Sequence, residues 1–139
     1  MIDFHYLTEF SIEEEIQYVN WINRIITSED SLVGQLDFIF CSDTYLLKIN
    51  QDYLEHDTYT DIITFPYGEG KLISGDIFIS IERVAENAKT YEVDFCTELQ
   101  RVMAHGLLHM LGYSDKNDEE TQMMRAKENE KIKLFHVEH

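Results

Sequence analysis

The feature that most constrains this chain is the apolar run from Leu99 to Gly112, which carries two histidines and no proline. Such a run predicts a helix, and Gly112 is suited to end it because glycine adopts a positive φ without strain. His105 and His109 are four residues apart, so both imidazoles project from one face of the predicted helix, one turn apart. This spacing allows two histidines to grip one metal ion.

Asp115 follows the glycine, where the chain can turn back toward the same point. Two histidines and one carboxylate leave a fourth position open for water, as in catalytic zinc sites, whereas structural zinc sites are usually closed by four protein ligands. We therefore predict one zinc ion held by His105, His109 and Asp115. The alternative is that the histidines are core or surface residues without a metal, because the spacing alone is a weak pattern.

The segment from His105 to Tyr113 resembles the metal-binding signature of the YbeY-type endoribonucleases, also called ribosomal RNA maturation factors. In that family a His-Gly-x-Leu-His-x-x-Gly-Tyr core is followed by Asp-His. This chain matches the core, but Ser114 stands in place of the aspartate and Asp115 in place of the third histidine. The resemblance is therefore to a variant with a carboxylate at the third ligand position.

Three other segments carry the same resemblance. Asn50–Tyr53 and Thr60–Pro66 are similar to the family's Asn-x-x-Tyr-Arg and Thr-Asp-Val-Leu-Ser-Phe-Pro, and Ser74–Ser80 is similar to its Gly-Asp-Ile strand. The similarity spans about residues 37 to 130. Leu54 occupies the place of a family arginine associated with RNA cleavage, so this departure bears on the activity more than on the fold.

Strand-like and helix-like segments alternate along the chain, with no repeat or linker, and predict one domain over residues 1–139. We expect an α+β fold of three layers, with about four strands in a mixed sheet and about five helices. The resemblance implies that the metal-bearing helix lies in the middle layer. The expected strands cover residues 2–6, 35–41, 60–65 and 75–80, and the expected helices begin near Ser11, Asp43, Ile81, Phe95 and Asn117.

Local patterns give finer expectations. Ser11 and Glu14, like Asn117 and Glu120, have the spacing of a capping box. Tyr91, Met123, Cys41 and Cys96 are expected to be buried, the two cysteines as free thiols. The three lysines of the last helix are expected on a solvated face: Lys127, Lys131 and Lys133. His56 lies in a polar connection from which it could approach the metal.

The net charge is −16, with 11 Lys and Arg against 27 Asp and Glu. Nucleic-acid binding normally needs a basic surface, so tight and independent RNA binding is disfavoured unless a local patch, a metal or a basic partner supplies positive charge. No apolar run approaches a membrane span, and the chain opens with no signal-peptide pattern. A cytoplasmic protein without membrane contact is expected.

The resemblance implies a metal-dependent endoribonuclease that acts on single-stranded RNA in ribosomal RNA maturation and ribosome quality control, by attack of a metal-activated water on a phosphodiester. Its partners would be ribosomal RNA and the ribosome or a ribosomal protein. Arg101 and Lys116 are candidate substrate-binding residues, although Arg101 could instead pair with Glu98. Gly106 stands where helical zinc proteases carry their general base, which disfavours a peptidase and leaves the base unassigned.

Two alternatives remain. A ribosome-assembly factor that binds ribosomal RNA or ribosomal proteins without cutting would suit the negative charge and the missing arginine. The donor set of two histidines and one carboxylate also resembles that of non-haem iron enzymes, but their ligands usually come from a barrel and not from one helix.

Overall fold

The computed structural model describes residues 1–54 and 58–136 of the chain. Within these ranges it contains four strands and five α-helices, followed by one short 3₁₀ helix. In chain order these are β1 (Ile2–Tyr6), α1 (Glu15–Ser28), β2 (Leu32–Cys41), α2 (Asp43–Leu54), β3 (Ile62–Pro66), β4 (Leu72–Ser80), α3 (Ile81–Thr90), α4 (Phe95–Met110), α5 (Asp118–Lys133) and the 3₁₀ helix Leu134–His136.

The strands form one mixed sheet in the order β1-β2-β4-β3. β1, β2 and β4 run parallel to one another, whereas β3 runs antiparallel to β4 at one edge. The predicted α+β class with a mixed four-stranded sheet and five helices is therefore confirmed. Among the helices of the described ranges, none is both long and apolar enough to cross a membrane.

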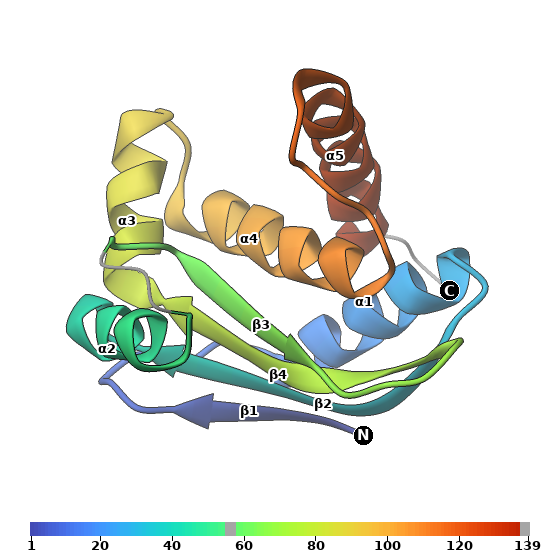
Figure 1. Ribbon diagram of the computed structural model, residues 1–139, viewed down its shortest axis with the longest axis horizontal. Coiled ribbons are helices and arrows are strands. Elements are labelled where there is room, and N and C mark those ends of the chain that lie inside the picture. The colour runs from blue at the N-terminus through green and yellow to red at the C-terminus, as the bar shows by residue number, and fades with distance from the viewer. Residues whose placement is uncertain (55–57, 137–139) are drawn as a thin grey trace.

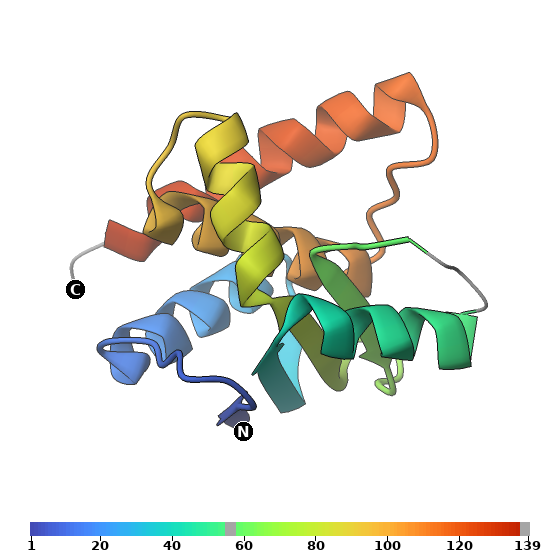
Figure 2. The same cartoon turned by 90° about the vertical axis from the view of Figure 1, so that its left-hand side faces the viewer.

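Helices cover the two faces of the sheet unequally. Side chains alternate along a strand, so Ile77 and Ile79 of β4 join the main core while Phe78 packs against a smaller one on the opposite face. The main core lies under α1 and α4, where Trp21 is fully buried. The smaller core lies under α2, and Figures 1 and 2 show α1 and α2 on opposite sides of the sheet.

α4 lies between the sheet and α5, which confirms its expected place in the middle layer (Figure 1). Gly106 lies where α4 meets the sheet. A Cβ at this position would lie 2.6 Å from Cδ1 of Ile62 and 3.4 Å from Cγ2 of Thr64 on β3. An alanine here would therefore require the Ile62 side chain to move.

The start of α1 differs from its prediction. Glu14 adopts the left-handed conformation, with φ 59° and ψ 57°, and α1 begins at Glu15 without a side-chain cap. The N–H of Ile12 instead donates to the hydroxyl of Tyr6, which in turn donates to Glu15. The predicted Ser11–Glu14 capping box is therefore wrong, and contacts with β1 hold this segment instead.

The cap of α5 is confirmed in part. The side chain of Asn117 accepts a hydrogen bond from the N–H of Glu120 at 2.8 Å. The carboxylate of Glu120 accepts from the hydroxyl of Ser114 at 3.1 Å and from the N–H of Lys116 at 3.0 Å. Glu120 thereby fastens the segment between α4 and α5 to the first turn of α5.

Four burial predictions were wrong. Tyr91 is 58% exposed because it follows the last residue of α3, and Met123 is 54% exposed. Cys96 is exposed, whereas Cys41 is buried as expected. Lys131 is only 1% exposed, because its ammonium donates to Ser28, Glu29 and Glu130 at 2.7–2.8 Å instead of facing water.

Candidate metal centre

After α4 the chain turns back toward His105 and His109. Gly112 has φ 104°, a conformation that favours glycine, and follows the last turn of α4 as predicted. The N–H of Gly112 donates to the carbonyl of His109, and the N–H of Tyr113 donates to the carbonyl of Leu108 at 3.0 Å. These bonds close the turn and bring Asp115 back over the helix.

His105, His109 and Asp115 converge on one point. The two Nε2 atoms are 2.9 Å apart, and Oδ2 of Asp115 lies 3.3 Å from Nε2 of His105 and 3.5 Å from Nε2 of His109. Ligand atoms held ~2.0–2.1 Å from a tetrahedral zinc ion lie about 3.3 Å from one another. The three side chains therefore fit a shared metal ion without rearrangement of the backbone, and they could hold one.

Each imidazole is oriented by an oxygen atom at its Nδ1. Nδ1 of His105 lies 2.6 Å from Oε2 of Glu128, and Nδ1 of His109 lies 3.0 Å from the carbonyl oxygen of Tyr113. Each acceptor favours the tautomer with the proton on Nδ1, which leaves the Nε2 lone pair free for a metal. A carboxylate or carbonyl behind a ligating histidine is the usual arrangement at metal sites.

Glu128 is the residue of this site that the sequence did not reveal. It is 4% exposed and comes from α5, where it also accepts from Arg101 at 3.0 Å. Burial disfavours ionisation of Glu128, but hydrogen bonds from His105 and Arg101 outweigh it and lower its pKa. Burial opposes charge on His105 as well, yet its pKa is raised because Glu128 lies beside it.

Tyr113 anchors the turn to the rest of the fold. Its hydroxyl donates to Glu29, the residue that follows α1, at 2.6 Å, while its carbonyl orients His109. Lys127 lies 5.5 Å from the centre of its ring. The family core ends at this tyrosine, but its contact with Glu29 could be found only in the folded chain.

The two candidate substrate-binding residues lie in different places. Arg101 points toward α5, where its guanidinium donates to Glu128 and to Asn129 at 2.9 Å, so the expected pair with Glu98 was wrong. Lys116 is exposed beside Asp115 and lines neither of the two cavities at the metal centre. His56 lies outside the described residues.

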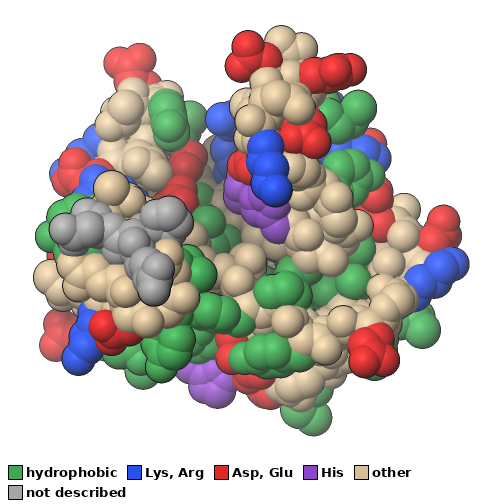
Figure 3. Space-filling model, in the orientation of Figure 1, with side chains coloured by type: hydrophobic (Ala, Val, Ile, Leu, Met, Phe, Trp, Pro, Cys, Tyr) green, Lys and Arg blue, Asp and Glu red, His purple; other side chains and the backbone are tan. Residues whose placement is uncertain are grey.

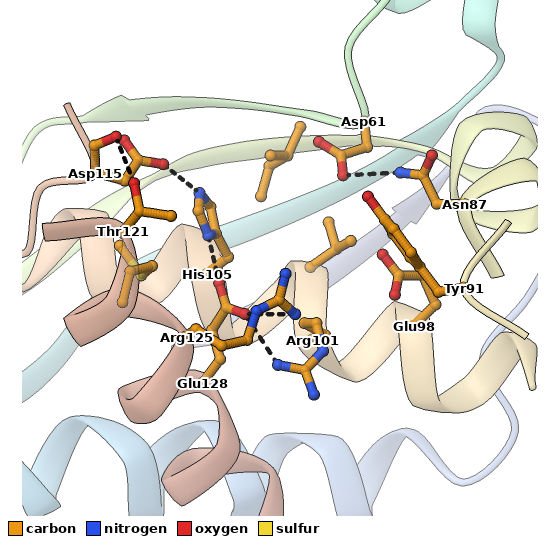
Figure 4. A pocket seen from close by; sticks show the side chains of 13 residues that line it. Asp61, Asn87, Tyr91, Glu98, Arg101, His105, Asp115, Thr121, Arg125 and Glu128 are labelled. Carbon is orange, nitrogen blue, oxygen red and sulfur yellow. Dashed lines mark hydrogen bonds and ion pairs between the residues drawn. The ribbon is translucent and has the colours of Figure 1, made fainter. Parts of the chain in front are cut away.

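Two cavities open beside the centre. One encloses about 200 Å³ between α3, α4 and α5 and is lined in part by His105, Asp115 and Arg101 (Figure 4). The other encloses about 600 Å³ between α2 and β3 and reaches both histidines, with Leu54 in its wall. Among its described lining residues the second cavity has no Lys or Arg, so no local cation replaces the arginine expected from the resemblance.

The surface around the centre is mixed in charge. Figure 3 shows histidine side chains in the hollow beneath α5, with acidic and basic side chains close by. The net charge of the whole chain is −16. The basic side chains near the centre are therefore a local exception to the acidic charge of the whole chain.

Comparison with known proteins agrees with this geometry. The family model described as endoribonuclease YbeY matches residues 5–136. Proteins named endoribonuclease YbeY from Flavobacterium johnsoniae and Flavobacterium psychrophilum are 54% and 56% identical to this chain. Each alignment covers 99% of this chain, and 99% and 98% of the respective relative.

A solved structure supports the fold independently. The solution structure of a Thermotoga maritima protein superposes with a TM-score of 0.66 at 25% identity, over 97% of this chain and 89% of that one. With a family model across nearly all of its length and close relatives of matching length, the chain belongs to the endoribonuclease YbeY family.

Proposed function

We propose that this protein is a metal-dependent endoribonuclease that cleaves single-stranded RNA during ribosomal RNA maturation and ribosome quality control. The observation that carries the proposal is the convergence of His105, His109 and Asp115 within ligand distance of one another, in a chain of this family. A role on ribosomal RNA implies work in the cytoplasm, with the ribosome or a ribosomal protein as partner.

The donor set supports zinc as the metal. Two imidazole nitrogens and one carboxylate oxygen form a three-ligand set of the kind that catalytic zinc sites use. A zinc ion bound there would supply a Lewis acid for a phosphate oxygen and an activated water. Glu128 and the carbonyl of Tyr113 would keep both Nε2 atoms directed at it.

The protein's own residues would position the RNA. Arg101 lines the cavity between α3, α4 and α5 and lies 3.0 Å from Glu128, so its charge is partly neutralised. Lys116 follows a ligand directly in sequence and is exposed, so its ammonium is available to a phosphate. We propose that these two residues bind the substrate.

A second candidate function is supported by Leu54 and by the net charge. The larger cavity at the metal centre has no Lys or Arg among its described lining residues, and the chain has a net charge of −16. Both features favour a ribosome-assembly factor that binds its partners without cutting RNA. This candidate predicts a bound metal but no cleavage.

One experiment separates the two functions. The purified chain is loaded with zinc, its metal content is measured by mass spectrometry, and a labelled single-stranded RNA is incubated with it beside the Flavobacterium psychrophilum relative. His105→Ala and His109→Ala remove ligands. His5→Ala is the matched control, because His5 is half-exposed and bonded to Asp37 on the sheet.

The nuclease proposal expects one metal ion per chain, cleavage by the wild type and by His5→Ala, and loss of both metal and cleavage in the two ligand variants. Full metal content without cleavage, while the relative cuts the same RNA, would establish the assembly factor instead. Cleavage that survives His105→Ala at full rate would reject this centre as the active site.

A further inference from the structure

The cavity between α3, α4 and α5 contains a carboxylate that the proposed chemistry does not use. This cavity of about 200 Å³ touches His105 and Asp115, so whatever occupies it lies directly beside the metal centre. Glu98 forms part of its wall and is 4% exposed. Figure 4 shows its carboxylate at the cavity, below Tyr91.

Glu98 lacks the partners that a buried carboxylate normally has. Among the described residues, no side chain donates a hydrogen bond to it, and none forms an ion pair with it. Burial and the nearby charge of Asp61 raise its pKa. Its carboxylate oxygens keep accessible surface at the cavity, so a ligand that brings N–H donors can replace water there.

The remaining walls restrict what that ligand can be. Arg101 and Arg125 also line the cavity, but they lie 3.0 and 3.5 Å from Glu128, so neither is paired with Glu98. Ile62 and Val102 present apolar surface, which suits the face of a planar ring. A flat group with N–H donors at its edge therefore fits both the apolar wall and the Glu98 carboxylate. The bases of RNA have this character.

We propose that this cavity receives the base of the nucleotide next to the cleaved phosphate, and that Glu98 selects guanine there. This inference rests on the proposed function, because it gives the substrate preference of the same site. Guanine carries two adjacent donors, N1–H and the N2 amino group, which match the two oxygens of one carboxylate. Adenine, cytosine and uracil offer at most one donor group on that edge, beside acceptors that a carboxylate repels.

The other three acidic side chains of the cavity are already engaged. Glu128 accepts from Arg101 and lies beside His105, and Asp115 lies 3.3 Å from His105. Asp61 accepts a hydrogen bond from the side chain of Asn87 at 3.3 Å, and its own backbone carbonyl accepts from Ser80. This leaves Glu98 as the acidic side chain of the cavity without a donor among the described residues. It thereby acts as a specificity-determining residue and not as a ligand of the metal.

The test uses uridine 12-mers that carry a single guanosine, inosine, adenosine or cytidine. Inosine is the critical probe, since it retains N1–H but lacks the N2 amino group. Binding to the metal-free protein is measured by fluorescence anisotropy, and cleavage by the zinc-loaded protein is measured on the same RNAs. Glu98→Gln is compared with Glu9→Gln, an exposed control outside the cavity, and thermal melting establishes that both variants fold.

We expect the wild type and Glu9→Gln to bind the guanosine RNA about tenfold more tightly than the inosine RNA, and Glu98→Gln to bind both about equally. Equal binding of the two RNAs by the wild type, no binding of either, or an unchanged ratio in Glu98→Gln would overturn the guanine pocket. Cleavage without base preference would reject the pocket while the nuclease stands. A preference lost in Glu98→Gln, in a protein that never cuts, would reject the nuclease while the pocket stands.

Discussion

Nδ1 of His105 lies 2.6 Å from Oε2 of Glu128, a residue 23 positions further along the chain and on a different helix. The first predicted ligand is thus oriented by the last long helix, and α4 alone does not complete the site.

Glu128→Gln should weaken zinc binding by about 10- to 100-fold, because a neutral amide is a poorer partner for Nδ1 than a carboxylate. The measurement is a zinc titration against a competing chelator. Glu119→Gln, in the exposed first turn of α5, should keep the wild-type affinity. Equal zinc affinity in Glu128→Gln and the wild type would mean that Glu128 serves only the fold.

Asp115→Ala should lower the metal content, since two imidazoles alone hold zinc poorly, and RNA cleavage should fall with it. Asp115→His restores the three-histidine set that the resemblance describes and should retain one metal ion per chain. Elemental analysis of the purified variants gives the answer. A fully metallated Asp115→Ala protein would remove Asp115 from the ligand set.

Leu54→Arg should strengthen RNA binding at low salt, because Leu54 lines the cavity that reaches both histidines. One added phosphate contact should steepen the dependence of log K on log salt by about 0.7 for a single strand. Leu32→Arg is the control, since Leu32 is 64% exposed at the start of β2. The same gain from both variants would indicate a general charge effect.

Glu29 should contribute pH-dependent stability. Burial opposes its ionisation, but hydrogen bonds from Lys131 and Tyr113 outweigh this and lower its pKa from 4.5 to about 2. Because the folded pKa is the lower one, the contribution is complete above pH 4.5 and is lost as the pH falls toward 2. Glu29→Gln should cost about 2–3 kcal/mol at pH 7, less than a fully broken buried pair, because Glu130 still contacts Lys131.

Urea unfolding at pH 7 and at pH 3 measures that difference. The gap between wild type and Glu29→Gln should shrink at pH 3, whereas the exposed control Glu9→Gln should follow the wild type at both values. A gap of the same size at pH 3 would show that the lost charge is not its cause.

The two cysteines should differ in reactivity. Cys96 is exposed, while burial and the nearby charge of Asp43 raise the pKa of Cys41 to about 12. A thiol reagent should therefore add one label to the native protein and two in denaturant, as counted by intact mass. Two labels on the native protein would contradict the burial of Cys41.

The convergence of His105 and His109 was predictable because its information is local. Their spacing places both on one face of a helix, and Gly112 after them allows the turn that returns Asp115. Glu128 carries no such signal, since Arg125, Lys127 and Asn129 around it are polar as well. Its burial is decided by how α5 packs on α4.

The same limit explains the other errors. Lys131 looks like a surface lysine in sequence, and the approach of Ser28 and Glu29 at the end of α1 gives its ammonium partners away from water. The Ser11–Glu14 box satisfies the local rule for a helix start, yet the N–H of Ile12 donates to Tyr6 of β1 and Glu14 adopts the left-handed conformation. Strand and helix order was predictable because it depends on hydrophobic period, whereas these contacts depend on the tertiary arrangement.

The order of synthesis has a consequence for the site. α4 carries both histidines and is made before α5, which supplies the carboxylate behind His105. A nascent chain on the ribosome therefore holds its imidazoles without the group that directs one of them at a metal. The candidate metal centre becomes complete only when translation has passed Glu128 and α5 has docked, so the growing polypeptide leaves the ribosome with these side chains not yet assembled.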